Sequence, residues 1–365
     1  MRYIEKLLEG VEVEWKQLGE VTELKRGTSI TKNTSNEGQY PVISGGQQPA
    51  YYIDQFNREG ETITVAGSGA YAGFVMYWNE PIFVGDAFSI KADESQAFPR
   101  YVYHFLLNIQ DKVHELKSGG GVPHVYAKDV ARFNIPIPPL EIQKEIVRIL
   151  DAFTELTAEL TAELTARKKQ YNYYRGQFLS FKEEEVEWKK LGEIGEIRRG
   201  TAITEKETSP GDYPVVANGP SHNYYHDQSN RSGETIIIAR SGAYAGLVSY
   251  WDIPIFLTDA FSIHPDNKFL STKFLYYVLK KDQTKIHNMS KGAGVPHVRA
   301  KDFESYIVPV PPLQEQERIV SILDKFDTLT TSISEGLPKE IELRKKQYEY
   351  YRDILLTFPK DNLKA

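Results

Sequence analysis

The chain has 365 residues, of which 41% are hydrophobic, and a formal net charge of −6 at pH 7. Its length predicts two or three domains, and its acidic balance disfavours a protein that coats nucleic acid regardless of sequence. The absence of cysteine excludes disulfides, thiolate zinc sites and cysteine nucleophiles. There is no run of 18 apolar residues and no signal-peptide core, so we expect no membrane association and a cytoplasmic location.

Residues 1–12 are predicted to form a short helical segment, and residues 13–137 a first lobe (lobe 1) that is repeated at residues 183–310 (lobe 2). Short matching motifs all lie 173 residues apart, as Trp15 does from Trp188. Because the matches share one offset, they indicate duplication of a whole lobe. Other matched pairs are Gly27 and Gly200, Gly60 and Gly233, Asp86 and Asp259, and His124 and His297.

Each lobe is predicted to be mixed α and β, with strands before a helix. Glycine-punctuated strand patterns occur at residues 61–66, 74–78 and 81–84, and their counterparts recur in lobe 2. Helices are expected at residues 99–117 and 271–290, ending at glycine-rich loops that include residues 119–121 and 292–294. A linker with little regular structure is expected to close each lobe.

Long helices are predicted at residues 138–182 and 311–358, each opening on Pro-Pro-Leu, followed by a tail at 359–365. Apolar residues of the first helix alternate in spacings of four and three, which is typical of a helix that packs on another helix. About 40 helical residues span about 60 Å, which is too long for burial in one small domain. We therefore expect two antiparallel helices that form a coiled-coil spacer. The seam comprises Ile142, Ile146, Ile149, Phe153, Leu156 and Leu160.

The two long helices differ in two ways. Gly336 and Pro338 are predicted to kink or break the second one. The first carries Thr-Ala-Glu-Leu twice in tandem, at residues 157–160 and 161–164. Four residues lengthen a helix by about 6 Å and turn it by about 40°. Such units either adjust the reach of the spacer or are neutral drift in a solvated helix.

No motif predicts catalysis or a cofactor. The sequence lacks a Walker loop, a Gly-x-Ser-x-Gly elbow, a His-Glu-x-x-His helix and the Asn-Pro-Pro-aromatic motif used on a flipped adenine. Residues 67–73 are rich in glycine, but strand rather than helix follows them, so a tight interstrand turn is preferred to a phosphate loop. A turn that contacts a ligand is the alternative.

Two further groups of polar residues are assigned structural roles. His222 and His226 have the spacing of a metal pair, but Pro49 and Ile53 replace them in lobe 1, so no metal site is expected. Asp86 and Asp259 each precede Ala-Phe-Ser-Ile, and we expect them in buried turns.

The chain consists of a lobe, a proline hinge and a long helix, followed by a second copy of all three. The hinge of the first copy is Ile135-Pro136-Ile137-Pro138-Pro139-Leu140, and the helices start with Glu141-Ile142-Gln143 and Gln314-Glu315-Gln316. This arrangement resembles the specificity subunit of type I restriction-modification enzymes. The resemblance covers essentially the whole chain. It implies that each lobe is a target recognition domain that reads half of a split site in double-stranded DNA. It also implies that the helices set the separation of the halves and dock two adenine-methylating modification subunits, that restriction subunits join the complex, and that catalytic groups lie in those partners.

The residues lead to a similar picture without the resemblance. Duplicated lobes at opposite ends of antiparallel helices are related by an internal near-two-fold axis, which suits DNA and offers two equivalent docking surfaces. The alternatives are a self-contained methyltransferase or nuclease with two recognition lobes, and a symmetric scaffold that binds only proteins. The missing catalytic motifs count against the former.

Candidate DNA contacts follow from comparing the lobes: matched positions are expected to be scaffold and phosphate contacts, and differing positions to select bases. Gly67 is replaced by Arg240 and Tyr126 by Arg299, and an arginine binds guanine in a bidentate manner. His124 and His297 are either structural turn residues or donors to DNA. Because much else is repeated, we expect related half-sites and an interrupted near-palindrome. The candidates are Gln47, Gln48, Ser68, Tyr71, His124, Tyr126 and Lys128 in lobe 1, and Ser221, Arg240, Ser241, Tyr244, His297, Arg299 and Lys301 in lobe 2.

Overall fold

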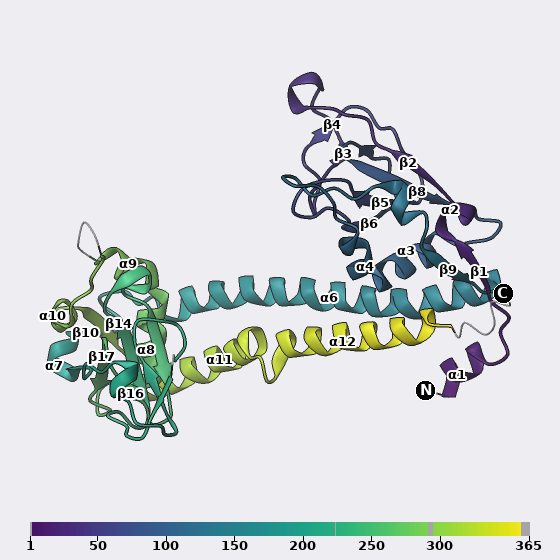
Figure 1. The fold of residues 1–365 in the computed structure, drawn as a ribbon. Coiled ribbons are helices and arrows are strands. Elements are labelled where there is room, and N and C mark those ends of the chain that lie inside the picture. Colours follow the sequence, from purple (N-terminus) through teal and green to yellow (C-terminus); the bar gives the residue numbers. More distant parts are fainter. Residues whose placement is uncertain (1, 223, 291–294, 359–365) are drawn as a thin grey trace. The chain divides into compact units, whose positions relative to one another are not determined.

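The structure is a computed structural model that describes residues 2–222, 224–290 and 295–358 (Figure 1). It divides into two units, one formed by Met1–Thr161 with Glu340–Ala365 and the other by Ala162–Lys339. Each is mixed α and β, as predicted. The predicted tail at 359–365 and the loop at 292–294 lie outside the described residues. Within the described ranges, no helix is both long and apolar enough to cross a membrane.

The first unit contains a four-stranded antiparallel sheet in the order β2-β8-β5-β6, a three-stranded sheet in the order β4-β3-β7, and the pair β1-β9. Strand β5, one of the two interior strands of the four-stranded sheet, is buried along its whole length. The predicted strands at 61–66, 74–78 and 81–84 correspond to β5, β6 and β7. The strands are β1 (Glu14–Gln17), β2 (Thr22–Arg26), β3 (Tyr40–Ile43), β4 (Tyr52–Ile53), β5 (Thr62–Ala66), β6 (Val75–Trp78), β7 (Phe83–Val84), β8 (Ala87–Ala92) and β9 (Asn134–Ile137).

The second unit repeats this topology strand for strand, as β11-β17-β14-β15, β13-β12-β16 and β10-β18. The register repeats as well, since Val65 pairs with Phe88 and Ile238 with Phe261. The duplication predicted from the constant offset is therefore a duplication of fold. The strands are β10 (Glu187–Lys190), β11 (Gly195–Arg199), β12 (Tyr213–Val216), β13 (Tyr224–His226), β14 (Thr235–Ala239), β15 (Val248–Trp251), β16 (Phe256–Leu257), β17 (Ala260–Pro265) and β18 (Ile307–Val310).

Short helices cover the sheets and close the lobes. In the first unit they are α1 (Arg2–Leu8), α2 (Leu18–Val21), η1 (Lys32–Thr34), α3 (Pro99–Asn108), α4 (Gln110–Glu115) and α5 (Ala127–Val130). In the second they are α7 (Leu191–Ile194), η2 (Glu205–Glu207), η3 (Gly242–Tyr244), α8 (Thr272–Lys281), α9 (Gln283–Asn288) and α10 (Ala300–Glu304).

The single helices expected at 99–117 and 271–290 are each two helices, which corrects the prediction. The break places a glutamine against the turn between two strands. Gln110 Nε2 donates to the Gly73 carbonyl at 2.7 Å, and its Oε1 accepts from the Val75 N–H at 3.1 Å. Gln283 makes the equivalent bonds in the second unit, at 2.7 and 3.0 Å. The reoriented chain thus satisfies backbone groups that the turn leaves unpaired.

The expectation of a nearly structureless linker before the prolines was wrong. Residues 127–130 form α5, and β9 pairs in antiparallel fashion with β1 so that Trp15 lies opposite Pro136. In the second unit Trp188 lies opposite Pro309 in the same way. The proline-rich segment is therefore the last strand of each lobe, and it leads directly into a long helix.

The long helices are α6 (Leu140–Phe178), α11 (Leu313–Thr331) and α12 (Gly336–Leu356). The break before α12 confirms the effect expected of Gly336 and Pro338, and Gly336 has a positive φ of 82°. In the second unit Tyr171 and Tyr174 lie beside Phe326, and Phe178 lies beside Arg318. Partner numbers fall as α6 numbers rise, so these segments are antiparallel.

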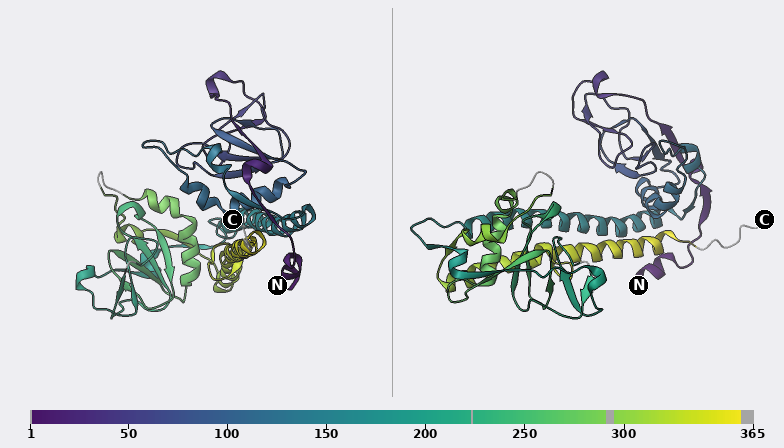
Figure 2. Two further views of the ribbon diagram at one scale, coloured as in Figure 1. Left: turned by 45° about the vertical axis from the view of Figure 1, so that its right-hand side comes forward. Right: turned by 60° about the vertical axis from the view of Figure 1, so that its left-hand side comes forward.

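In the first unit α12 and the beginning of α6 also run in opposite directions, as their colours show in Figures 1 and 2. Phe153 stacks on Tyr351 with ring centroids 5.2 Å apart. The seam residue Ile146 is fully buried in the core of this unit. The predicted short helix α1 packs there, since Ile4 joins the same core and the Tyr3 hydroxyl donates to Glu145 at 2.6 Å.

A buried glutamine fixes the start of each long helix to its lobe. Gln143 is fully buried, and its Nε2 donates to the carbonyls of Gln96 and Pro138 at 2.9 and 2.8 Å. Its Oε1 accepts from the Phe98 N–H at 2.8 Å. Gln316 makes the equivalent three bonds in the second unit, all at 2.8 Å. The Glu-x-Gln and Gln-x-Gln motifs thus join hinge, helix and lobe.

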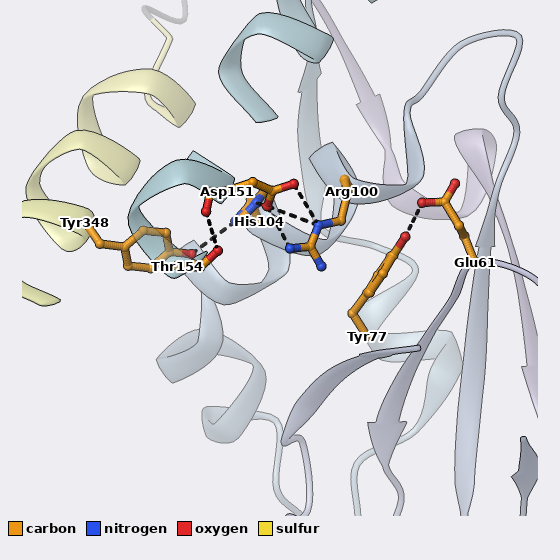
Figure 3. Close-up of polar contacts among 7 residues, drawn as sticks. All are labelled: Glu61, Tyr77, Arg100, His104, Asp151, Thr154 and Tyr348. Atoms are coloured by element: carbon orange, nitrogen blue, oxygen red, sulfur yellow. Dashed lines mark hydrogen bonds and ion pairs between the residues drawn. The ribbon is translucent and has the colours of Figure 1, made fainter. Parts of the chain in front are cut away.

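A polar network joins α3 to α6 in the first unit (Figure 3). Arg100 Nη2 lies 2.7 Å from Asp151 Oδ1, and His104 Nε2 lies 2.8 Å from the same oxygen. His104 Nδ1 lies 3.1 Å from the Tyr348 hydroxyl on α12. Because the carboxylate only accepts, Nε2 carries the proton of a neutral imidazole and Nδ1 accepts from Tyr348. In the second unit Asp324 is paired with Lys273 and Tyr277 instead.

This network makes the first unit sensitive to acid. Burial lowers the pKa of His104, although Asp151 opposes that effect. The unfolded chain therefore takes up a proton below about pH 6.5 that the folded chain rejects, so stability falls as the pH drops below that value, by at most about 1.4 kcal/mol per pH unit. Burial raises the pKa of Asp151, but hydrogen bonds from His104 and Arg100 and the charge of Arg100 outweigh it and lower that pKa to about 2, so the contribution of Asp151 is lost only at lower pH.

We expect His104→Gln to flatten the dependence between pH 6.5 and 5, because an amide can donate to Asp151 and accept from Tyr348 without titrating. Urea unfolding of both proteins at several pH values measures the difference. His264 in the second unit also has a pKa that burial lowers. Because both proteins contain His264, its contribution to the pH dependence cancels in the comparison. Parallel pH profiles for the two proteins would contradict this assignment.

Candidate nucleic-acid interface

A surface hollow lies at the same place in each lobe. In lobe 1 it has a volume of about 240 Å³ and lies between the end of β2, the turn after β5, the start of β8 and the loop before α5. In lobe 2 the equivalent segments, together with Ala202, Ile203, Thr204 and Glu207, line a larger hollow of about 700 Å³. The polar lining residues are Arg26, Asp86, His124, Tyr126 and Lys128 in lobe 1, and Arg199, Arg240, Asp259, His297 and Arg299 among others in lobe 2.

Backbone hydrogen bonds hold the walls of each hollow together. Ser68 and His124 form an isolated β-bridge, and the Val125 N–H donates to the Gly67 carbonyl at 3.0 Å. Ser241 and His297 form the same bridge in lobe 2. The predicted turn between strands is confirmed at residues 67–73, which connect β5 to β6. The repeated histidines are therefore bridge residues through their backbones, while their side chains line the hollows.

Asp86 and Asp259 are not buried, which corrects the expectation for both. Asp86 is exposed and accepts a hydrogen bond from the Ser68 hydroxyl. Asp259 is partly exposed and accepts from the Ser241 hydroxyl at 2.9 Å. Each strand β8 or β17 begins one residue later, so the carboxylate projects where the chain enters the sheet. The Ser–Asp pair is thus a repeated feature of both hollows.

Lobe 2 adds two residues to this pair. Arg240 Nη1 lies 3.4 Å from Asp259 Oδ1. Asn218 Nδ2 donates to Asp259 at 2.5 Å and to the Ser241 hydroxyl at 2.9 Å. Its Oδ1 accepts from the backbone N–H groups of residues 240 and 241 at 2.9 and 3.1 Å. The amide therefore fixes the turn that carries Arg240.

Lobe 1 has glycine at both equivalent positions. A Cβ at Gly45 would lie 2.5 Å from the Ser68 carbonyl oxygen, so the chain there passes too close for a side chain. Gly67 replaces Arg240, and Asp86 has no ion pair within the described part of lobe 1. The two hollows therefore differ in charge at this place: Asp86 stands beside Gly67 in lobe 1, whereas Asp259 stands beside Arg240 in lobe 2.

The other wall is the start of a short helix. Tyr126 precedes α5, stacks on His124 with centroids 6.1 Å apart, and has Lys128 Nζ 5.7 Å from its ring centre. Arg299 precedes α10 and pairs with Asp302 at 3.2 Å. An exposed aromatic ring in one lobe thus corresponds to an exposed guanidinium in the other.

The structure brings only part of the predicted set together. Ser68, His124, Tyr126 and Lys128 cluster in lobe 1, and Arg240, Ser241, His297 and Arg299 in lobe 2. The others are exposed but line neither hollow; they are Gln47, Gln48 and Ser221 after β3 or β12, Tyr71 and Tyr244 in the turns, and Lys301 on α10.

Sequence reasoning missed Arg26 and Arg199 altogether. They end the equivalent edge strands β2 and β11 and line the two hollows. Each is exposed, and their guanidinium groups form no ion pair within the described residues. The sequence did offer one signal, the repeated glycine that follows each arginine. A Cβ at Gly27 or Gly200 would lie within 2.1 Å of a backbone oxygen, so the chain passes close to another segment there.

No group of three or more potential ligands that could hold a metal ion occurs among the residues that the structure describes. His226, which had been weighed as half of a metal pair, is buried and lies 3.1 Å from Asp227. The hollows therefore offer cations, an aromatic ring and carboxylates. These groups can bind phosphates and the edges of bases.

The sequence matches the family model described as type I restriction modification DNA specificity domain twice, over residues 10–167 and 183–343. It is 38% identical to the type I restriction enzyme EcoR124I/EcoR124II specificity subunit of Escherichia coli, over 99% of this chain and 98% of that protein. It is 33% identical to a putative specificity subunit of Haemophilus influenzae, over 98% of each chain.

The fold is similar to the crystal structure of a type I restriction-modification system S subunit from M. genitalium. The TM-score is 0.71 at 22% identity, and the match covers 96% of this chain and 98% of the other. Two family domains in one chain agree with the duplicated lobes and with the long helix that follows the first of them. The chain therefore belongs to the family of type I restriction-modification specificity subunits.

Proposed function

We propose that the chain is the DNA-reading subunit of a type I restriction-modification complex, and that the hollow in each lobe contacts one half of a split site in double-stranded DNA. The observation that carries this proposal is the pair of hollows at equivalent places in the two lobes, each lined by an exposed arginine at the end of an edge strand and each with a different residue at position 67 or 240. Two modification subunits and restriction subunits supply the chemistry, and the complex works in the cytoplasm.

Within each hollow, repeated cations and differing residues have separate tasks. Arg26 and Arg199 occupy equivalent positions and are proposed to bind phosphates, which positions the lobe without selecting a base. Lys128, which lines the hollow of lobe 1, and Lys301, which lies on α10 outside the hollow of lobe 2, are proposed to do the same. The differing pairs Gly67 and Arg240, and Tyr126 and Arg299, are proposed to select bases. Because the matched positions outnumber these, we propose related half-sites that form an interrupted near-palindrome.

Sequencing of methylated sites in a cell that expresses the chain with its modification subunits tests this function. The expected result is one split motif with a fixed gap and similar halves. Two wholly dissimilar halves would contradict the near-palindrome but not DNA reading. Methylation without any sequence preference would contradict the function. If the purified chain alone methylated or cut DNA, the enzyme alternative would replace it.

The division between phosphate and base contacts predicts two classes of variant. We expect Arg26→Ala and Arg199→Ala to weaken DNA binding by the complex for all sequences and to reduce the salt dependence of log K by about one unit each. Binding titrations of specific and random duplexes at several salt concentrations measure both. Lys268→Ala removes an exposed cation outside both hollows and is the matched control.

A further inference from the structure

We propose that the pair Gly67 and Arg240 gives the two hollows opposite hydrogen-bonding roles toward DNA. In lobe 1 the carboxylate of Asp86 faces the DNA as an acceptor and selects a base with an amino group in the major groove, adenine or cytosine. In lobe 2 Asp259 orients the Arg240 guanidinium, which selects guanine. This inference rests on the proposed function and assigns a chemistry to each half-site.

The acceptor in lobe 1 is the free oxygen of Asp86. The Ser68 hydroxyl donates to Oδ2, which leaves Oδ1 without a hydrogen-bond partner in the described part of the lobe. Position 67 is glycine and therefore places no side chain beside that oxygen. An ionised carboxylate has no donor. Its partners in the major groove are the N4 amino group of cytosine and the N6 amino group of adenine, whereas guanine presents only acceptors there.

In lobe 2 both oxygens of the equivalent carboxylate are engaged. Oδ2 of Asp259 accepts from Ser241 and Asn218, and Oδ1 lies against Arg240. The carboxylate is therefore a positioning group. A guanidinium has five N–H donors, and the contact at 3.4 Å occupies one nitrogen. The other nitrogens remain available for the O6 and N7 atoms of guanine, which is the usual bidentate contact of arginine.

The backbone geometry at position 67 allows the glycine to be replaced by arginine. Gly67 does not have a positive φ, so an L side chain is compatible with its backbone. A Cβ there would lie 3.3 Å from the Asp86 carbonyl oxygen and 3.5 Å from Asp86 Oδ1. An arginine at this position would therefore start beside the same carboxylate that Arg240 contacts in lobe 2. Gly45 does not allow the same exchange, because of its close approach to Ser68.

The test is methylated-motif sequencing with the complete complex, comparing wild type with Gly67→Arg and Arg240→Gly. Arg240→Gly should remove the preference for guanine at one position of one half-site, a change in discrimination on the order of ten- to a hundredfold. Gly67→Arg should replace adenine or cytosine by guanine at one position of the other half-site. Each variant should leave the opposite half unchanged.

Gly120→Arg is the matched control, since it adds the same charge in lobe 1 where nothing lies within 4 Å. It should leave the motif unaltered. The inference is overturned if Gly67→Arg and Arg240→Gly change the same half-site, or if neither variant changes the motif. Should Gly67→Arg prevent assembly, Asp86→Asn serves instead: it adds a donor and should relax the choice at the same position, and an unchanged motif would overturn the inference. A wild-type complex without sequence preference would refute the proposed function itself.

Discussion

Replacing Gln316 by leucine should lower the free energy of unfolding of the second unit by about 3 kcal/mol. The side chain is fully buried, and its amide is bonded at both ends. Leucine has similar size and a good helix propensity, so the shape of the site and the helix are retained. What is lost is the partner of three backbone groups, the N–H of Ser271 and the carbonyls of Phe269 and Pro311.

Each of these groups costs about 1–3 kcal/mol if it stays buried without a partner. The cost is larger than the value of an ordinary hydrogen bond, because water cannot replace the amide at the closed junction of hinge, helix and lobe. The same change at Gln143 should destabilise the first unit to a similar extent, since its three bonds have the same lengths to within 0.1 Å.

Gln314→Leu is the matched control: it lies two residues earlier on the same helix, is exposed, and forms no side-chain bond within the described residues. Urea unfolding, with hydrogen exchange followed in residues 269–316, measures the effect. Equal losses for Gln314→Leu and Gln316→Leu would show that the buried bonds do not stabilise the junction.

The repeat made the architecture predictable, whereas contacts between distant segments were not. The constant offset and the apolar seam of Ile146 and its neighbours predicted two similar lobes and a long helix, because both signals are local or periodic. The break at Gly336 was predictable because glycine and proline act on their own backbone. The helix break before Gln110 was missed, since it depends on bonds to Gly73 and Val75.

The candidate interface shows the same limit. Sequence comparison placed Arg240 and Arg299 among the base-selecting residues, because each differs from its counterpart. It misjudged Asp86, whose exposure depends on where β8 begins, and it missed Arg26, which reaches the hollow from 60 positions earlier in the chain. A short motif contains no information about which distant residues lie beside it in the folded chain.

Removing residues 161–164, one of the two Thr-Ala-Glu-Leu units of α6, should shorten the gap between the two methylated half-sites and leave the bases of each half unchanged. The unit lies within the continuous helix that leads from the first unit of the chain into the second. Four residues contribute about 6 Å of helix. This distance corresponds to between one and two base pairs, each of about 3.4 Å.

The deletion nearly preserves the face of the helix, because four residues turn it by about 400°, only about 40° beyond one full turn. Leu160 and Leu164 are both half-buried, so one can take the place of the other in the seam. The four residues of break between α11 and α12, at 332–335, give the second helical segment room to adapt to the new length. We therefore expect the variant complex to assemble and to methylate a site with a new gap.

Insertion of a further Thr-Ala-Glu-Leu after Leu164 should lengthen the gap by the same amount, and sequencing of methylated sites measures both changes. Thr161→Ala with Glu163→Ala keeps the length of α6 and is the control, for which the wild-type motif is expected. The half-site bases act as an internal standard, because no residue of either hollow is altered. A gap that stayed constant through deletion and insertion would mean that α6 does not set the spacing, and the repeat would then be neutral variation in a solvated helix.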